Sequence, residues 1–169
     1  EQEIIWDGPG YIEDYLEDIK FQISSKSFYQ VNPTQAEILY RYGLEYANIT
    51  KDDVVIDAYC GIGTISLFLA RHAKHVYGVE IVEAAIEDAN RNAQNNNITN
   101  VTFKTEDAKV FMQRLASENK AIDVVVCDPP RKGCAQEFLD AVVTLHPKRF
   151  VYISCNVATQ ARDVAYLKD

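Results

Sequence analysis

The chain has 169 residues, of which 47% are hydrophobic and 25% charged, a composition that excludes a disordered protein and fits one globular domain. Its formal net charge of −8 argues against a free-standing nucleic-acid-binding protein. No apolar run approaches the roughly 18 residues that a membrane span needs, so we expect no membrane partner.

The first part of the chain, residues 1–31, is acidic and rich in alternating apolar residues. Its first 20 residues hold seven acidic groups and one lysine, a net charge of −6, which leaves −2 for the remainder. The alternation over 11–16 and 19–24 predicts paired strands, hence a small β-hairpin appendage. There is no signal peptide and no initiator methionine, so we expect a cytoplasmic piece of a longer protein with reduced cysteines.

The rest of the chain, residues 32–169, predicts one α/β domain. Pro33 suits the first turn of a helix that we expect to run to about Ala47. Strands and helices then alternate. We expect strands at 54–57, 75–80, 101–104, 122–127 and 150–154, and helices at 64–72, 82–95, 108–118, 136–145 and 158–167. This alternation predicts a doubly wound, mostly parallel sheet of the Rossmann-like type.

A glycine-bearing loop after the first strand of that sheet indicates a cofactor site. Gly61 and Gly63 allow a tight turn, close backbone approach to a ligand, and helix N–H groups aimed at it. Glu80 ends the next strand, where a carboxylate can accept hydrogen bonds from ribose hydroxyls. The third glycine of the dinucleotide fingerprint is absent, which favours S-adenosyl-L-methionine over a nicotinamide cofactor. An ordinary strand–helix turn and a nicotinamide oxidoreductase remain alternatives.

Polar residues also follow the later strands. Asp107 can accept from an adenine amino group or cap the helix that follows it, and the two roles are compatible. After the fourth strand, two prolines fix an extended backbone without donors and leave the Asp128 carboxylate for a ligand. Arg131 can meet RNA phosphate or form a surface ion pair. Cys155 precedes a predicted helix whose N-terminus lowers a thiol pKa, although an inert buried thiol is the alternative.

Four segments resemble, in order and spacing, the motifs of the RNA uracil-5-methyltransferases: residues 28–35, 57–63, 128–133 and 154–156. The resemblance covers about residues 20–169. It implies the S-adenosylmethionine-dependent methyltransferase fold and methylation of C5 of a uridine in ribosomal or transfer RNA, with 23S ribosomal RNA favoured. Val157 stands where the family usually has proline.

The resemblance also implies residue roles. Cys155 corresponds to the nucleophile that adds to uracil C6, which makes C5 reactive toward the methyl group. Phe28 corresponds to an aromatic near a target base that must leave its stack. The cofactor-binding positions correspond to Gln30, Tyr59, Glu80 and Asp128.

Some family parts are not matched within this chain. The resemblance places the catalytic base beyond Asp169, together with further strands of the domain, and it places an RNA-binding barrel and an iron–sulfur segment elsewhere too. We therefore expect a domain that is incomplete at its C-terminal end, contacts RNA mainly through other regions, and is weak or inactive alone. Two alternatives stay open: an amino-group methyltransferase that uses Asp128-Pro129-Pro130, against which Arg131 weighs because that motif usually continues with an aromatic, and a non-catalytic cofactor- or RNA-binding fragment.

Overall fold

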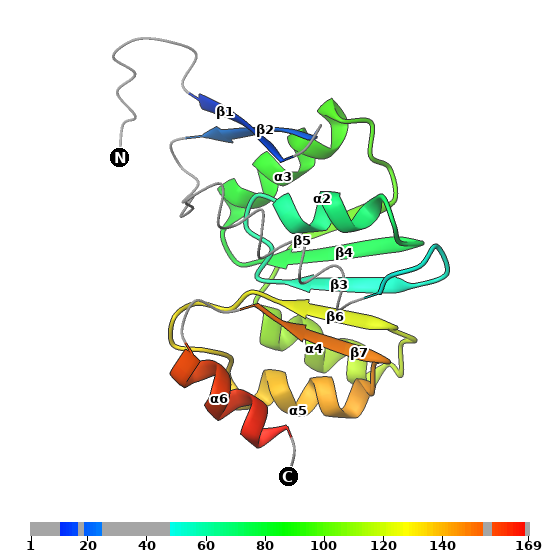
Figure 1. Ribbon diagram of the computed structural model, residues 1–169, viewed down its shortest axis with the longest axis vertical. Helices are drawn as coiled ribbons and strands as arrows, with labels where there is room; N and C mark the ends of the chain where they lie inside the picture. The colour runs from blue at the N-terminus through cyan, green and yellow to red at the C-terminus, as the bar shows by residue number, and fades with distance from the viewer. Residues whose placement is uncertain (1–10, 17–18, 25–47, 154–156, 168–169) are drawn as a thin grey trace.

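The computed structural model describes residues 11–16, 19–24, 48–153 and 157–167 (Figure 1). The predicted helix over 32–47 lies outside these residues. The elements in chain order are β1 (Tyr11–Leu16), β2 (Ile19–Ser24), β3 (Val54–Ala58), α2 (Thr64–Ala70), β4 (His75–Glu80), α3 (Glu83–Asn95), β5 (Val101–Thr105), α4 (Ala108–Ser117), β6 (Val124–Cys127), α5 (Gln136–Leu145), β7 (Arg149–Tyr152) and α6 (Val157–Tyr166).

The centre of the molecule is a five-stranded sheet in the order β5-β4-β3-β6-β7, with every neighbouring pair parallel. The predicted parallel α/β sheet is therefore confirmed. β3 lies in the middle, and the chain builds outward first through β4 and β5 and then through β6 and β7. The direction of winding reverses between β3 and β6, and in open α/β sheets ligands bind at such a switch point.

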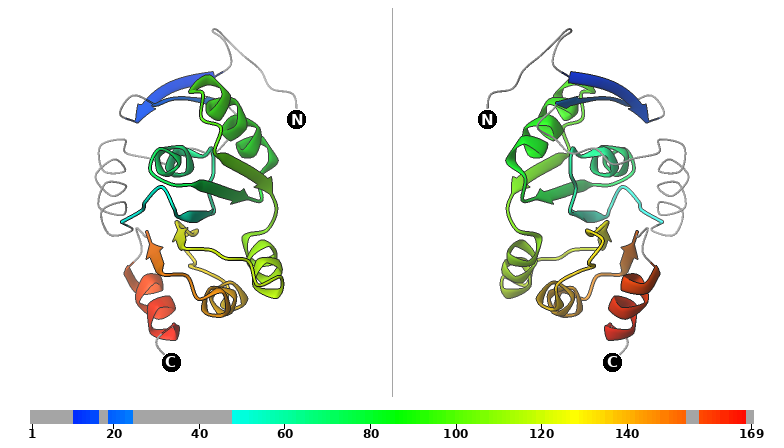
Figure 2. Two further views of the ribbon diagram at one scale, coloured as in Figure 1. Left: turned by 90° about the vertical axis from the view of Figure 1, so that its right-hand side faces the viewer. Right: turned by 90° about the vertical axis from the view of Figure 1, so that its left-hand side faces the viewer.

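Two layers of helices cover this sheet (Figure 2). Side chains of α2 and α3 form the core on one face, with Leu67 and Ala89 among its buried members. Side chains of α4 and α5 form the core on the other face, where Met112 and Phe138 are fully buried. β6 is buried along its whole length because helices cover both of its sides, which explains its continuous apolar run Val124–Cys127.

The strand predicted over 122–127 begins only at Val124. Asp123 lies just before β6, and it links the start of β6 to the start of β3. Its carboxylate accepts from the Val54 N–H at 2.8 Å, and its own N–H donates to the Val54 carbonyl at 3.0 Å. These bonds, together with the Lys148 ammonium at 3.3 Å, hold the pKa of Asp123 below its ordinary value.

The expected hairpin is present in the described backbone. β1 and β2 pair antiparallel, with Tyr11 opposite Ser24, and β2 lies against α3. Whether residues 1–31 form a separate unit stays a prediction. In the part of the chain that the structure describes, no helix has the length and apolar character that a membrane crossing requires.

Because all five strands of the central sheet are parallel, their carboxyl ends meet at one edge. The loops that start at Tyr59, Ile81, Glu106, Asp128 and Ile153 all leave from this edge. The polar residues singled out from the sequence in the described part of the chain are therefore gathered by topology alone.

Candidate functional site

The loop between β3 and α2 has an unusual backbone. Tyr59, Gly61 and Gly63 all have positive φ, at 62°, 55° and 83°. A side chain at Gly61 would meet nothing within 4 Å, so this glycine lies beside open space. Gly63 is enclosed instead, because a Cβ there would lie 2.7 Å from the Phe103 ring. The two glycines thus differ in role: Gly63 is required by packing, whereas Gly61 leaves room for a ligand.

Phe103 on β5 fills the space that two glycines leave. A Cβ at Gly78 on β4 would also come within 2.6 Å of the Phe103 ring. The sequence analysis missed this arrangement. The available signal was a glycine inside a strand, which often marks a place where another group approaches the backbone closely.

Glu80 at the end of β4 is bound to the same loop. Its carboxylate accepts from the backbone N–H of Gly61 at 3.1 Å and from those of Ile81 and Val82 at 2.8 and 3.2 Å. A carboxylate has about four acceptor positions, so three are in use and one remains for a ligand. The structure therefore brings together two residues, Gly61 and Glu80, that the sequence assigned to one site.

Asp57 at the centre of the sheet edge was not predicted as a site residue. It is fully buried, and the Ser66 hydroxyl donates to one of its oxygens at 2.5 Å. The other oxygen, Oδ1, is the only buried side-chain polar atom without a hydrogen-bond partner among the described residues. Burial, with the nearby Asp128 carboxylate adding to it, raises the pKa of Asp57 to about 7.

Asp128 follows β6, the neighbour of β3 in the sheet. Burial raises its pKa to about 6. Asp57 and Asp128 thus form a pair of carboxyl groups that are poorly solvated and repel each other. A cation placed beside them would favour their ionised forms, and the unpaired oxygen of Asp57 supplies an acceptor for a donor group.

Two other predicted residues have partly defined surroundings. Asp107 caps α4, since its carboxylate accepts from the N–H of Lys109 at 2.8 Å and of Val110 at 3.4 Å. Its capping role is confirmed, and an adenine contact stays a prediction. Arg131 is exposed, at the tip of a turn closed by the Gly133 N–H and the Pro130 carbonyl at 2.8 Å.

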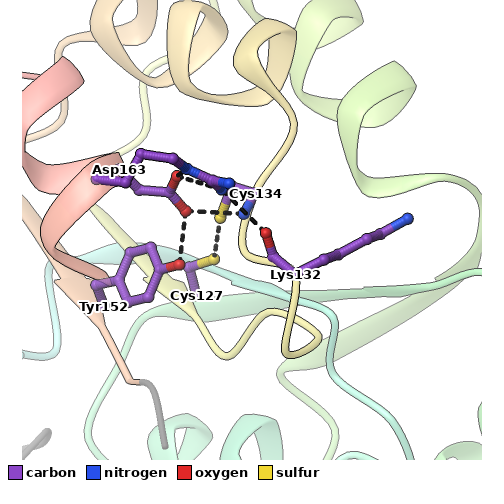
Figure 3. A network of polar contacts seen from close by, with 6 residues as sticks. Cys127, Lys132, Cys134, Tyr152 and Asp163 are labelled. Atoms are coloured by element: carbon purple, nitrogen blue, oxygen red, sulfur yellow. Dashed lines mark hydrogen bonds and ion pairs between the residues drawn. The ribbon is translucent and has the colours of Figure 1, made fainter. Parts of the chain in front are cut away.

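Asp163 on α6 joins three segments next to this turn (Figure 3). Its Oδ2 accepts from the Tyr152 hydroxyl at 2.6 Å and from the Cys134 N–H at 2.8 Å. Its Oδ1 accepts from the Arg162 guanidinium at 2.7 and 2.9 Å. Burial raises the pKa of Asp163, but these hydrogen bonds outweigh burial and hold the pKa below its ordinary value. Asp163 was not predicted, because nothing near it in the sequence reveals its partners.

Three of the four cysteines are described, and all three are buried. Burial raises the pKa of the Cys60 and Cys127 thiols well above the ordinary value. The Cys127 and Cys134 sulfurs lie 3.2 Å apart within the core. Since the reactive form is the thiolate, the raised pKa makes Cys60 and Cys127 unsuited to nucleophilic attack.

The predicted nucleophile Cys155 lies outside the described residues, as do Gln30 and Phe28. The structure describes both sides of Cys155. β7 ends at Tyr152, and α6 begins at Val157, one residue before the predicted helix start. The helix expected after Cys155 is therefore present.

A hollow of about 450 Å³ lies between the 132–136 segment, α5 and α6. Its lining includes Cys134, Leu139, Arg162 and Tyr166, but not Gly61, Glu80 or Asp128. It is not the site formed by the glycine loop. Among the described residues, no group of three or more His, Cys, Asp or Glu side chains could hold a metal ion.

Residues 10–169 match the family model described as tRNA (uracil-5-)-methyltransferase. Proteins of Oceanobacillus iheyensis and Halalkalibacterium halodurans, each named as an uncharacterized RNA methyltransferase, are 55% identical to the chain over 166 residues. These matches cover 98% of the chain but 36% of each relative. The chain thus spans about a third of the length of these curated relatives.

Solved structures show a similar fold. The Pyrococcus abyssi tRNA (uracil-54, C5)-methyltransferase in complex with S-adenosyl-L-homocysteine matches with a TM-score of 0.78 and 32% identity, over 95% of this chain and 38% of that one. An Agrobacterium tumefaciens SAM-dependent methyltransferase matches with a TM-score of 0.73 and 18% identity, over 95% of this chain and 59% of that one. The second match shows the fold alone.

Proposed function

This chain belongs to the tRNA (uracil-5-)-methyltransferase family, and from that premise we propose that it methylates C5 of a uridine in RNA with S-adenosyl-L-methionine as the methyl donor. Its fold is that of the S-adenosylmethionine-dependent methyltransferases. The observation that carries the proposal is the junction of the Gly61 loop with the Glu80 carboxylate, next to the buried Asp57 and the half-buried Asp128.

The chemistry of these residues fits the methyl donor. S-adenosylmethionine carries a ribose, an adenine and two cationic groups, a sulfonium and an ammonium. Glu80 retains an acceptor position for a ribose hydroxyl, and Asp57 and Asp128 would stabilise a cation. Ile81 directly follows Glu80 and is 65% exposed, so it offers an apolar face to the adenine. Asp107 can accept from the adenine amino group with lone pairs that its capping role leaves unused. Gln30 and Tyr59 complete the proposed contacts.

Cys155 is the proposed nucleophile. Its thiolate would add to uracil C6, and the electron pair of the C5–C6 double bond would move onto the uracil as an enolate. C5 then takes the methyl group, a base removes the C5 proton, and the C6–S bond breaks to return the thiolate. Two observations support this proposal: the described thiols are buried, and α6 begins two residues after Cys155.

We propose a ribosomal RNA uridine, in 23S RNA first, as the substrate, with a transfer RNA uridine as the second candidate. The relatives of this chain are named only as RNA methyltransferases, while the family model is named for tRNA. The target base must leave its stack to reach a nucleophile at the sheet edge. Amino-group methylation is disfavoured, since Arg131 occupies the place where such enzymes carry an aromatic that stacks on the base. The isolated chain should turn over weakly, because it covers 36% of its relatives.

RNA that carries 5-fluorouridine tests the nucleophile in the full-length protein. Fluorine does not leave C5 as a proton does, so the covalent adduct should persist and shift the protein on a denaturing gel. Cys155→Ala should abolish the shift, whereas the matched control Cys60→Ala should keep it. A persistent adduct in Cys155→Ala would contradict the assignment. Separate digests of ribosomal and transfer RNA locate the modified uridine.

A calorimetric titration of the chain tests the cofactor. S-adenosylhomocysteine should bind, and NAD should not. Glu80→Ala should weaken S-adenosylhomocysteine binding by about 1.5–3 kcal/mol, the range for hydrogen bonds that involve a charged group. Unchanged affinity in this variant would remove Glu80 from the site.

A further inference from the structure

Asp163 is a buried carboxylate whose hydrogen-bond donors come from three different parts of the chain. It is 2% exposed, yet every donor around it belongs to a segment near the sheet edge. Tyr152 is the last residue of β7, Cys134 follows the Asp128–Gly133 loop, and Arg162 lies beside Asp163 on α6. Removing a buried carboxylate from water is costly, so a fold tolerates it only when its partners are in place.

The same donors and their neighbours hold the ends of two loops. Arg162 also donates to the Lys132 carbonyl at 3.0 Å, which ties the loop after β6 to α6. Gln160 on α6 donates to the Tyr152 carbonyl at 3.3 Å, and the Ile153 N–H donates to the Cys127 carbonyl at 2.8 Å. Asp163 and its neighbours on α6 thus connect Lys132 and Cys134, which follow Asp128 in the chain, to Tyr152 at the end of β7 (Figure 3).

We propose that Asp163 is a positioning residue for methyl transfer: its carboxylate holds β7 and α6, the two elements that flank Cys155 in the chain, in place relative to the loop that bears Asp128, and it does not contact substrate. The proposal rests on the proposed function, because it takes Cys155 as the nucleophile and Asp128 as a cofactor contact. Small displacements of reacting groups lower rates strongly, on the order of 10²-fold for about 1 Å. A carboxylate that aligns two loops can therefore matter to the rate without touching the reacting atoms.

The chain offers a matched pair of substitutions. Tyr152→Phe removes a hydroxyl that donates to Asp163 at 2.6 Å, and Tyr166→Phe removes one that donates to Asp140 at 2.6 Å. Both carboxylates lie on helices of the same layer, α6 and α5. The Asp140 contact, however, involves neither loop. A general loss of helix packing would affect both variants, whereas loss of loop alignment would affect Tyr152→Phe alone.

Two readouts in the full-length protein test the proposal. The first is the single-turnover methylation rate at saturating RNA and S-adenosylmethionine. Tyr152→Phe should lower it about tenfold or more, with Tyr166→Phe within about twofold of the wild type. The second is the pH profile of Cys155 alkylation by iodoacetamide, followed by mass spectrometry. Tyr152→Phe should slow alkylation at neutral pH about threefold or more. The buried Cys60, Cys127 and Cys134 should react slowly throughout.

Asp163→Asn should lower the methylation rate and slow Cys155 alkylation more strongly than Tyr152→Phe does. If Asp163→Asn does not fold, Tyr152→Phe alone tests the proposal. Rates and alkylation profiles for Tyr152→Phe that match those of Tyr166→Phe would overturn the positioning role. Failure of the proposed function gives a different result: the wild type would form no adduct with 5-fluorouridine RNA, while the alkylation profiles would still decide whether Asp163 sets the environment of Cys155.

Discussion

The two sides of the β3–β6 boundary hold their functional side chains in different ways. On the β4 side, Glu80 and Asp107 accept hydrogen bonds from backbone N–H groups, and all but the Gly61 contact come from within three residues. On the β7 side, the Asp163 carboxylate accepts from its neighbour Arg162 and also from residues 11 and 29 positions away. Local turns therefore shape the first side, whereas a long-range side-chain network holds the second.

The largest expected effect on stability tests whether the backbone conformation of the loop between β3 and α2 stabilises the β4 side of the boundary. Gly63→Ala places a Cβ at 2.7 Å from the Phe103 ring and at 3.0 Å from the Ala89 Cβ, on a residue with φ of 83°. Overpacking and the left-handed backbone together should lower the free energy of unfolding by about 3–4 kcal/mol, measured by urea denaturation. Gly61→Ala is the control, because its Cβ meets open space, and it should lose only about 1 kcal/mol. Equal losses of stability in the two variants would show that Gly63 is no more constrained by packing than Gly61.

The next effect concerns Asp57, which lies on the boundary and has an unpaired oxygen. The pKa of Asp57 is about 7 in the folded chain against an ordinary value of 3.8, so between these values the folded chain holds a proton that the unfolded chain has released. Wild-type stability should therefore fall as the pH rises from about 4 to about 7 and level off above that. Asp57→Asn lacks this contribution. Relative to the wild type, the variant should gain about 2–3 kcal/mol in free energy of unfolding between pH 5 and pH 8. If the difference in free energy of unfolding between the wild type and Asp57→Asn did not change with pH, the pKa of Asp57 would not be raised in the folded chain.

The smallest expected effect on stability tests whether the hydrogen bonds on the β4 side act only within their own element. Asp107→Ala removes two hydrogen bonds at the start of α4 and should lower the free energy of unfolding by about 1 kcal/mol. Because the cap touches only its own helix, Cys155 alkylation should not change. Asp107→Asn keeps a capping oxygen and should recover most of the stability. Slower alkylation in Asp107→Ala would show that the two sides are coupled.

The same contrast explains what could be predicted from the sequence. Strand and helix positions followed from periodicity, and β4 and α5 have the predicted bounds. The closeness of Glu80 to the glycine loop could be predicted, because the strand order places the end of β4 beside that loop. Asp163 could not, since its contacts with Cys134 and Tyr152 exist only once α6 packs beside β7. Asp57 looked like an ordinary strand residue, and its unpaired oxygen depends on how tightly the sheet is covered. The catalytic, cofactor and substrate roles of the site residues all remain predictions, and Phe28, Gln30 and Cys155 also lie outside the described residues.

The raised pKa values of Asp57 and Asp128 affect the heat that accompanies ligand binding. Between about pH 6 and pH 7, Asp57 and Asp128 hold protons for part of the time in the empty protein. A cationic ligand beside them favours the ionised forms and expels those protons into the buffer. The heat of binding S-adenosylmethionine will then include the ionisation heat of the buffer, and it should differ between phosphate and Tris. The slope of that difference counts the protons released.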